Sequence, residues 1–226
     1  MNDSAKLTDR IIGRDDLHAA WSAGTRILTD CDLDEGDFSG LDLEDLVLER
    51  CSLRGARFDG ATLASARFLG CRAAESAFVG ADLGNALISG GDFNNASFRR
   101  ARLVSARFER CKLTGADLTD ASTIGIALEE TLLSYARLPG ISLRKAVLKR
   151  VDLSEADLQK ADFRLAVFED SSLRNATLAG SRFEQADLRG ADLGGIELMD
   201  ARLFRGATIS RIQAAELLSQ LGLIVL

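Results

Sequence analysis

Residues 56–70 read ARFDG-ATLAS-ARFLG, three five-residue units whose first position is small and whose third is bulky and apolar. The pattern continues in both directions. From Leu28 to Leu203 every fifth residue is Leu, Phe or Ile, except at Ala73 and Thr123. These are 36 consecutive units without an insertion or deletion, and alanine fills the small position in 19 of them. This repeat decides the fold of most of the chain.

A period of five fits neither a helix nor a straight strand. On an α-helix five residues turn by about 500°, so the apolar residues would spiral over every face. On a strand an odd period places successive bulky residues on opposite faces. A chain that bends once per unit, with two side chains inward and three outward, fits the pattern. Such a chain is a solenoid.

A second period of 20 residues gives the number of units per coil. Phe38, Phe58, Phe78 and Phe98 recur at this spacing, and three columns of charged residues alternate in sign. Residues on adjacent strands lie roughly 4.7–4.9 Å apart, where opposite charges attract. Four units per coil therefore predict nine coils in a rod of about 40 Å. The charged columns are Arg110, Glu130, Arg150 and Asp170; Glu129, Lys149, Glu169 and Arg189; and Asp117, Arg137 and Asp157.

The last position of a unit is often glycine, and Pro139-Gly140 is the preferred pair for a type II turn. Tandem A(D/N)Lxx units with such corners resemble the pentapeptide-repeat family. The resemblance implies an all-β solenoid, namely a right-handed, four-sided β-helix with a helical cap at each end. We expect an N-terminal tail and cap over residues 1–25, the repeats over 26–205, and a C-terminal cap and tail over 206–226.

Composition narrows the function. The net charge of −6 argues against a general nucleic-acid binder. No apolar run is long enough to span a membrane, and the N-terminal MNDSAKLTDR has no signal-like apolar stretch. These features predict a cytoplasmic protein that contacts neither nucleic acid nor membrane directly.

All four cysteines take the small inward position of their units; they are Cys31, Cys51, Cys71 and Cys111. The functional interpretation is a metal site or disulfides. Stacked cysteines would have Cβ atoms nearly 5 Å apart, whereas a disulfide needs about 3.5–4.5 Å, and a single column cannot surround a zinc ion. We therefore expect reduced, buried filler.

The N-terminal cap is predicted from local signals. Residues 1–9 are polar and expected to form a mobile tail. A helix is expected over residues 14–23, with Trp21 as the lid of the open core. His18, the only histidine, has no nucleophile or carboxylate arranged around it, so we expect no catalytic role.

The C-terminal cap has a stronger signal. Ser210 and Gln213 form a capping box. The helix that follows is expected to pack one apolar face on the rod, made of Ile212, Ala215, Leu218 and Leu221. More apolar residues remain than one face needs, which predicts a two-fold dimer. The candidate interface is Ile212, Leu217, Leu218, Leu221, Leu223, Ile224, Val225 and Leu226.

The first full coil, residues 26–45, holds eight acids against Arg26 alone. Three of these acids have an arginine 20 residues later and should be paired: Asp30 with Arg50, Asp34 with Arg54, and Asp37 with Arg57. The unpaired acids could attract a basic partner or could guard against end-to-end association. The five candidates for partner binding are Asp32, Glu35, Asp42, Glu44 and Asp45.

At two units the third position, which we call the centre of the unit, does not hold a bulky apolar residue. Ala73 should leave a small gap, and Thr123, followed by the outward Ile124, is expected to mark a local distortion.

The sequence contains no P-loop, nucleophile elbow or His/Cys metal set, so we expect neither an enzyme nor a bound cofactor. The rod with its C-terminal helix and apolar tail resembles the Qnr and MfpA branch of the family and related immunity proteins against topoisomerase poisons. That resemblance implies a homodimer that imitates duplex DNA, binds DNA gyrase or a related type II topoisomerase, and modulates or protects it. The unbroken register leaves no room for the projecting loops of Qnr proteins. The alternative is a scaffold with a different protein partner.

Overall fold

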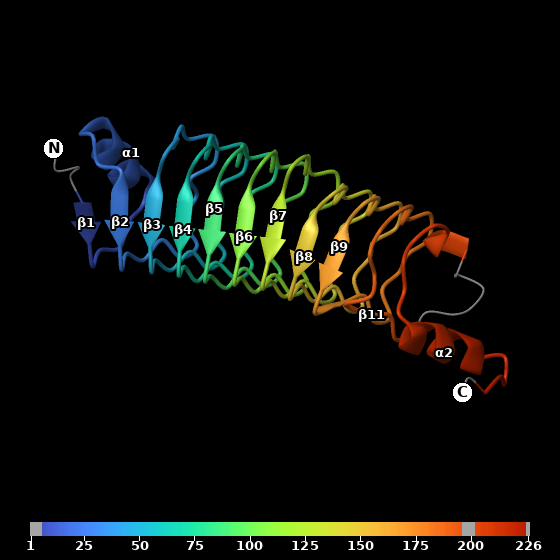
Figure 1. Cartoon of the computed structure of the whole chain (residues 1–226). Coiled ribbons are helices and arrows are strands. Elements are labelled where there is room, and N and C mark those ends of the chain that lie inside the picture. Colours follow the sequence, from blue (N-terminus) through green and yellow to red (C-terminus); the bar gives the residue numbers. More distant parts are fainter. Residues whose placement is uncertain (1–5, 196–201, 225–226) are drawn as a thin grey trace, which may run out of the picture.

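In the computed structural model, which describes residues 6–195 and 202–224, the chain winds into a rod of stacked coils (Figure 1). Each coil takes 20 residues and has four faces. In the first full coil, face 1 is centred on Leu28, face 2 on Leu33, face 3 on Phe38 and face 4 on Leu43. The right-handed, four-sided β-helix of about nine coils predicted from the repeat is confirmed.

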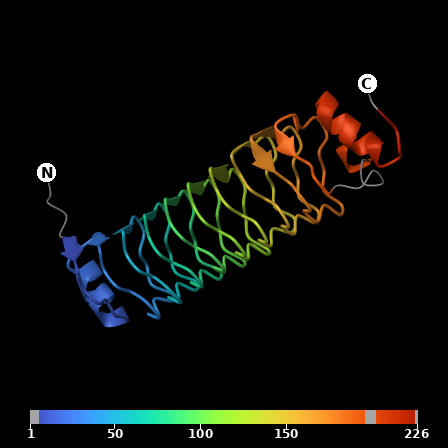
Figure 2. The same cartoon turned by 90° about the horizontal axis from the view of Figure 1, so that it is seen from below.

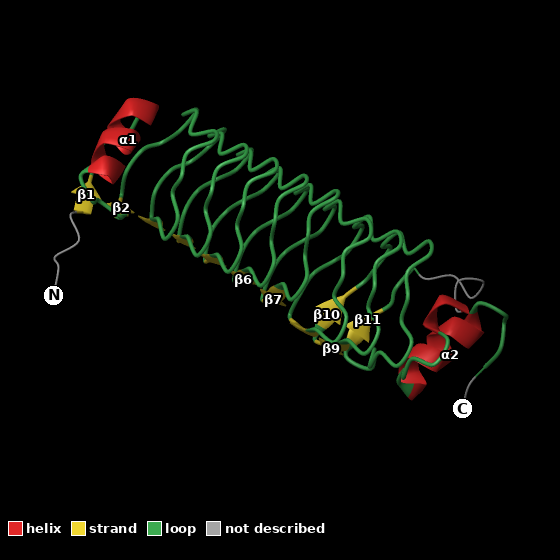
Figure 3. Ribbon diagram, turned by 90° about the horizontal axis from the view of Figure 1, so that it is seen from above, coloured by secondary structure: helices red, strands yellow, loops and turns green. Residues whose placement is uncertain are grey.

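Regular strands lie mainly on face 1, where β1 to β9 form one parallel sheet in chain order. Each strand pairs with the next one in the 20-residue register; Leu28, for example, lies beside Leu48. Figure 3 shows the strands along one side of the rod and the helices at its ends. The elements are β1 Lys6–Thr8, α1 Arg14–Ser22, β2 Ile27–Thr29, β3 Val47–Glu49, β4 Arg67–Leu69, β5 Leu87–Ser89, β6 Arg107–Glu109, β7 Ala127–Glu129, β8 Val147–Lys149, β9 Val167–Glu169, β10 Ser171–Ser172, β11 Ala191–Asp192 and α2 Arg211–Ser219.

The core is a single column of the bulky centres, with the small inward residues at its corners. On face 3 the rings of Phe38, Phe58, Phe78 and Phe98 stack with successive centroids 5.1, 5.2 and 5.1 Å apart. Offset ring stacking adds to the burial of each ring. The predicted 20-residue period is thus visible in the packing itself.

The corners require a left-handed backbone whichever residue occupies them. Gly140 has φ 71°, as the Pro139-Gly140 pair predicts, but Asp45 (64°), Tyr135 (59°) and Leu165 (62°) adopt it too. This conformation is costly for a residue with a Cβ atom. The hydrogen-bond ladders of the neighbouring coils hold these residues in place, so the repeat overrides local preference.

The N-terminal cap begins earlier than the sequence indicates. The prediction of a mobile tail over residues 1–9 is wrong for residues 6–8, because β1 adds a rung to the sheet and pairs Leu7 with Leu28. That pair is 21 residues apart, so the five-residue period does not reveal it. Residues 1–5 lie outside the described part of the chain.

The helix predicted over residues 14–23 is present as α1 and lies across the N-terminal end of the rod (Figure 2). Its first turn is closed by Gly13, whose N–H donates to Asp16 Oδ2 at 3.0 Å. Leu17 is fully buried, whereas the predicted lid Trp21 is half-buried and stacks on Arg26, with the guanidinium carbon 3.6 Å from the ring centroid. Leu17 closes the core, and Trp21 covers its margin.

Candidate partner-binding surfaces

The five candidate acids of the first coil are exposed, but they do not form one patch. Asp32 and Glu35 lie on face 2, whereas Asp42, Glu44 and Asp45 lie on face 4, on the opposite side of the coil. None of the five forms an ion pair with another described residue. The N-terminal end of the rod therefore presents free carboxylates on two opposite sides.

Two of these acids shape the local backbone. The Asp32 carboxylate accepts a hydrogen bond from the Asp34 N–H at 2.9 Å, which tightens the turn after the centre of face 2. Glu35 lies over Gly55 of the next coil, at a place where a Cβ atom would collide with its carboxylate. A larger residue at this corner would displace the flexible Glu35 side chain, and the φ of 62° at Gly55 favours glycine in its own right.

Of the three predicted pairs between the first two coils, one is an ion pair. Arg50 binds Asp30 through two hydrogen bonds of 2.8 and 2.6 Å, and this contact lowers the pKa of Asp30. The other two predictions are wrong. Asp34 accepts from the backbone N–H of Arg54 at 2.8 Å.

The third arginine, Arg57, turns along its own coil and binds Asp59 at 3.0 Å instead of Asp37. A partner two residues away on the same strand competes well with one on the next coil, because both lie on the same face.

Farther along the rod, several of the predicted charge columns are present. Glu130 binds Arg150, and Glu129 lies 3.5 Å from Lys149. Asp117 lies 3.9 Å from Arg137. These exposed pairs contribute little stability each, and they neutralise part of the charge on the middle coils.

The cysteines are free and buried, as predicted, but they are more than filler. At the corner between faces 1 and 2, the thiol of Cys51 points at the carbonyl oxygens of Leu28 and Glu49, both 3.5 Å away. Farther along the rod in the same column, Thr131 and Ser171 place hydroxyl groups on the equivalent carbonyls. Six of the nine residues in this column can donate in this way, whereas Gly91, Val151 and Ala191 cannot.

Burial makes these thiols unreactive. It raises the pKa of Cys51 to about 12 and that of Cys71 to about 11, and it also raises the pKa of Cys111. A thiol that stays protonated at neutral pH is a poor nucleophile and a poor metal ligand. Across residues 6–195 and 202–224, no group of three His, Cys, Asp or Glu residues is arranged to hold a metal ion.

The C-terminal capping box is confirmed, and one of its members does more than predicted. Gln213 N–H donates to Ser210 Oγ at 3.2 Å, and Ser210 N–H donates to Gln213 Oε1 at 2.7 Å. The side-chain amide of Gln213 is buried and donates to the carbonyls of Leu188 and Ala191, both at 2.7 Å. The Leu188 carbonyl also accepts from the Ala191 N–H at 2.9 Å, whereas the Ala191 carbonyl has no other donor among the described residues, so Gln213 satisfies the carbonyl that the end of the last coil leaves unpaired.

The prediction that Ile212, Ala215, Leu218 and Leu221 form the helix face that packs on the rod is wrong. Ile212 is 72% exposed and Leu221 60% exposed, while Gln213 and Leu217 turn toward the core. Hydrogen bonding by Gln213 fixes this rotation of α2. The apolar residues of the cap therefore face away from the rod: Ile212, Leu218, Leu221, Leu223 and Ile224. Val225 and Leu226 lie outside the described residues.

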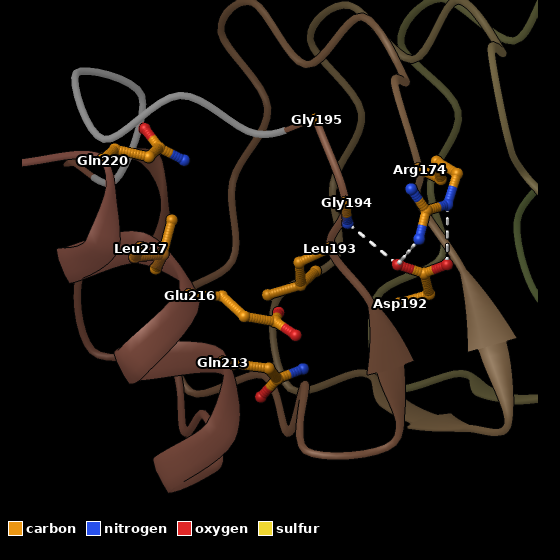
Figure 4. A pocket seen from close by; sticks show the side chains of 9 residues that line it. All are labelled: Arg174, Asp192, Leu193, Gly194, Gly195, Gln213, Glu216, Leu217 and Gln220. Carbon is orange, nitrogen blue, oxygen red and sulfur yellow. Dashed lines mark hydrogen bonds and ion pairs between the residues drawn. The ribbon is translucent and has the colours of Figure 1, made fainter. Parts of the chain in front are cut away.

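Two clefts lie at the ends of the rod. At the C-terminal end, a cleft of about 270 Å³ separates α2 from the last coil (Figure 4). Its cation, Arg174, is held by Asp192 through hydrogen bonds of 2.9 and 3.1 Å. At the N-terminal end, His18 and Trp21 of α1 border a shallow cleft above Asp42. Neither cleft brings a nucleophile, a base and an orienting group together.

No helix within the described residues has both the length and the apolar character needed to cross a membrane.

Comparisons with known proteins agree with this architecture. The family model described as "Pentapeptide repeats" matches in 8 copies, over residues 27–63, 42–76, 76–115, 111–150, 126–164 and 166–203. No curated protein matches the chain.

Among solved structures, a trypsin-treated form of QnrB1, a plasmid-mediated fluoroquinolone resistance protein, is similar with a TM-score of 0.63 and 20% identity, over 99% of this chain and 98% of that one. Full-length QnrB1 is similar with a TM-score of 0.62 and 20% identity, over 96% of this chain and 97% of that one. A third structure is HetL, a pentapeptide repeat protein involved in heterocyst differentiation regulation from the cyanobacterium Nostoc sp. strain PCC 7120. It is 26% identical, over 87% of this chain and 94% of that one, with a TM-score of 0.36. At this identity the likeness to QnrB1 shows a shared fold.

Proposed function

This chain belongs to the pentapeptide-repeat family, and we propose that it is a non-enzymatic, cytoplasmic protein that binds DNA gyrase or a related type II topoisomerase. In this proposal the rod occupies part of the path of duplex DNA on the enzyme. It thereby modulates the enzyme or protects it from poisons. The fold shared with QnrB1, a fluoroquinolone resistance protein, motivates the choice of partner.

The observation that carries the proposal is the group of five free carboxylates on the first coil. Asp32 and Glu35 project from one side of the rod, and Asp42, Glu44 and Asp45 from the opposite side. A partner that holds DNA contacts phosphates on both sides of a duplex with basic side chains. A rod with free carboxylates on both sides suits the same contacts, at least over this coil.

Dimerisation is the second part of the proposal. Large apolar side chains of α2 and its tail are solvent-exposed, and Ile224 is 86% exposed. Burial of such a patch against a second copy is favourable, and closed two-fold pairing is the commonest arrangement of identical chains. In this proposal the two caps meet and join two rods end to end.

A matched pair of variants tests the dimer. Ile224→Asp removes an apolar group of the cap, and Ile11→Asp makes the same change at a residue that is 84% exposed at the other end. Sedimentation velocity at micromolar concentration should give a dimer for the parent and for Ile11→Asp, and a monomer for Ile224→Asp. A monomeric parent would refute the dimer.

The topoisomerase proposal is tested with purified gyrase in a DNA supercoiling assay and a drug-stabilised cleavage assay. The parent protein should alter one or both, and more strongly at low salt, because exposed charges are screened by ions. The test variant carries Asn or Gln at the five candidate acids and should bind more slowly. The matched control neutralises five acids that are already paired: Asp82, Asp117, Glu129, Glu130 and Asp162.

Equal loss in both variants would mean that overall charge matters and the first coil does not. No effect of the parent protein, even at low salt, would reject the topoisomerase and leave a scaffold with another protein partner.

A further inference from the structure

Among the described residues, the hydrogen-bond ladder of the rod has an extended interruption on face 4. On face 4 and its corner, each coil normally bonds to the next; Ser105 N–H donates to the Ile124 carbonyl at 2.9 Å, for example. No backbone hydrogen bond joins residues 121–126 to residues 141–147, although both segments are fully described. We call these two segments the seam.

Strands β7 and β8, which border the seam, keep a single aligned pair, Glu129 with Lys149. Other neighbouring strands among β1 to β9 keep three. In Figure 1 the strands change slant between β7 and β8. The two coils are therefore in contact on the other faces but separated on face 4.

Three core substitutions account for the seam. The centre Thr123 carries a hydroxyl group into the core, where it needs a partner. Its Oγ1 accepts from the Ser142 N–H at 3.2 Å, and this N–H would otherwise donate to a carbonyl of the preceding coil. Thr123 thus competes with the ladder. On either side, Ile126 and Ile141 occupy positions that usually hold alanine, so extra volume adds to the separation.

The seam exposes two large apolar side chains. Ile124 is 69% exposed and Val147 is 56% exposed. On the neighbouring face 1, Val147 borders a hollow of about 160 Å³ over Ala127 and Leu128, whose rim is formed by the ion pairs Arg107–Glu109 and Lys149–Glu129. A single bulky apolar side chain from a partner would fill this hollow.

The charge beside the seam is positive and free. Arg144 and Lys145 are exposed and form no ion pair with any residue in the described ranges. Neighbouring cations on the same face are paired; Arg102 binds Asp82 at 2.8 Å, for example. The chain has a net charge of −6, so the local charge at these two adjacent free cations is opposite in sign to the net charge of the protein.

We propose that the seam is a docking surface for an acidic protein segment that carries a bulky apolar side chain. The apolar side chain packs on Val147 and enters the hollow at Ala127 on face 1, and the segment continues round the corner over Ile124 on face 4. Carboxylates of the segment meet Arg144 and Lys145, where charge complementarity favours encounter and sets orientation. The site is distinct from the acidic first coil, and the proposal does not rest on topoisomerase binding.

Backbone groups reinforce the match to an acidic segment. The N–H groups of Thr123 and Gly125 lack the acceptors that their counterparts find in the other coils of the described chain. A carboxylate is a strong acceptor for such groups. Two free cations are too few for stable binding of nucleic acid, which gains affinity from many phosphate contacts.

The test selects ligands without assuming their sequence. A phage-displayed library of random peptides is selected on the full-length protein, and the enriched peptides are synthesised with a fluorescent label. We expect acidic residues next to Phe, Leu or Trp. Anisotropy titrations should show binding that weakens about tenfold or more with Arg144→Glu/Lys145→Glu. Ile124→Ser should also weaken it.

The matched control is Arg67→Glu/Arg72→Glu, which makes the same charge change at two exposed arginines beside intact ladders. Peptides that bind this control and the parent equally, but not the seam variant, support the proposal. Enriched peptides without acidic residues, or equal binding to all three proteins, would overturn it. Tighter binding of single-stranded DNA than of the peptides, lost in the seam variant, would assign the surface to nucleic acid instead.

A second readout separates the seam from simple charge attraction. Amide hydrogen exchange at Thr123, Gly125 and Val147 should be fast in the free protein and slowed by the selected peptide. Binding without any change in exchange at these three amides would place the peptide elsewhere and contradict the proposal.

Discussion

Replacement of Gln213 by glutamate should destabilise the C-terminal end of the rod far more than its conservative size suggests. The side-chain amide donates two hydrogen bonds of 2.7 Å to the carbonyls of Leu188 and Ala191, and it is buried. A carboxylate fills the same space but cannot donate. It would also place a negative charge against two carbonyl oxygens.

The size of the effect follows from these contacts. The Leu188 carbonyl keeps the Ala191 N–H as a donor, so it loses one hydrogen bond worth about 0.5–1.5 kcal/mol. The buried Ala191 carbonyl is left without a donor, which costs about 1–3 kcal/mol. Gln213→Glu should therefore lower the free energy of unfolding by about 2–5 kcal/mol. For a chain of this length, the melting temperature should fall by about 5–15 °C. The matched control is Gln159→Glu at an exposed position, which should change little.

The pH dependence of Gln213→Glu gives a sharper test. The carbonyl oxygens and burial raise the pKa of the introduced carboxyl in the folded state above its unfolded value of about 4.3. The penalty is then largest at neutral pH and shrinks as pH falls through the raised pKa, because the protonated group can donate again. Thermal unfolding followed by circular dichroism at fixed protein concentration measures this. A melting temperature equal to that of Gln159→Glu at pH 7 would show that Gln213 does not hold the cap.

Three further predictions concern the core and the surface. Cys51→Val should cost about 1 kcal/mol in chemical denaturation because the Leu28 carbonyl loses its donor, whereas Cys51→Ser should be nearly neutral; equal losses would refute the role of the thiol. Arg189 lowers the pKa of Asp187 to about 2, so this pair stabilises the fold above about pH 4 and loses its effect as pH falls to 2. The difference in stability between the parent and Asp187→Asn should vanish at that pH, and a difference that persists would contradict the prediction. Leu103→Asp should cost more than about 4 kcal/mol, because an unpaired carboxylate would be buried in the core, and an unchanged melting temperature would refute the inward position of Leu103.

The repeat made the core of the rod predictable. A five-residue period admits one geometry, and every bulky centre from Leu28 to Leu193 is buried as that geometry requires. Stacking also follows from spacing alone, which is why Phe38 to Phe98 could be placed one above another. Charge columns were less predictable. Arg57 has a carboxylate within reach on its own coil as well as on the next, and spacing does not decide between them.

The ends and the seam could not be read from the period because they depart from it. β1 pairs across 21 residues, and α2 turns its polar Gln213 inward, where its amide donates to the Ala191 carbonyl that the last coil leaves without a donor. A hydrophobic pattern ranks Ile212 above Gln213 for the buried face, and hydrogen bonding reverses that order. At the seam, Thr123 was visible as an exception, but its consequence for the ladder depends on a contact with Ser142 in the next coil.

The charge of the rod limits how it could imitate DNA. A duplex of about 40 Å carries about 24 phosphate charges, at one per about 1.7 Å of axis, whereas the whole chain has a net charge of −6. Ion pairs such as Glu129 with Lys149 occupy part of the other acids, and the first coil, with eight acids against Arg26 alone, is where negative charge is most concentrated. If the C-terminal caps pair, these two acidic coils lie at the far ends of the double rod. A two-fold enzyme could then contact both ends at once, and the second contact would form at high effective concentration. Such a rod would bind weakly through one end and tightly through two, so loss of the dimer should reduce gyrase binding as much as loss of the acids does.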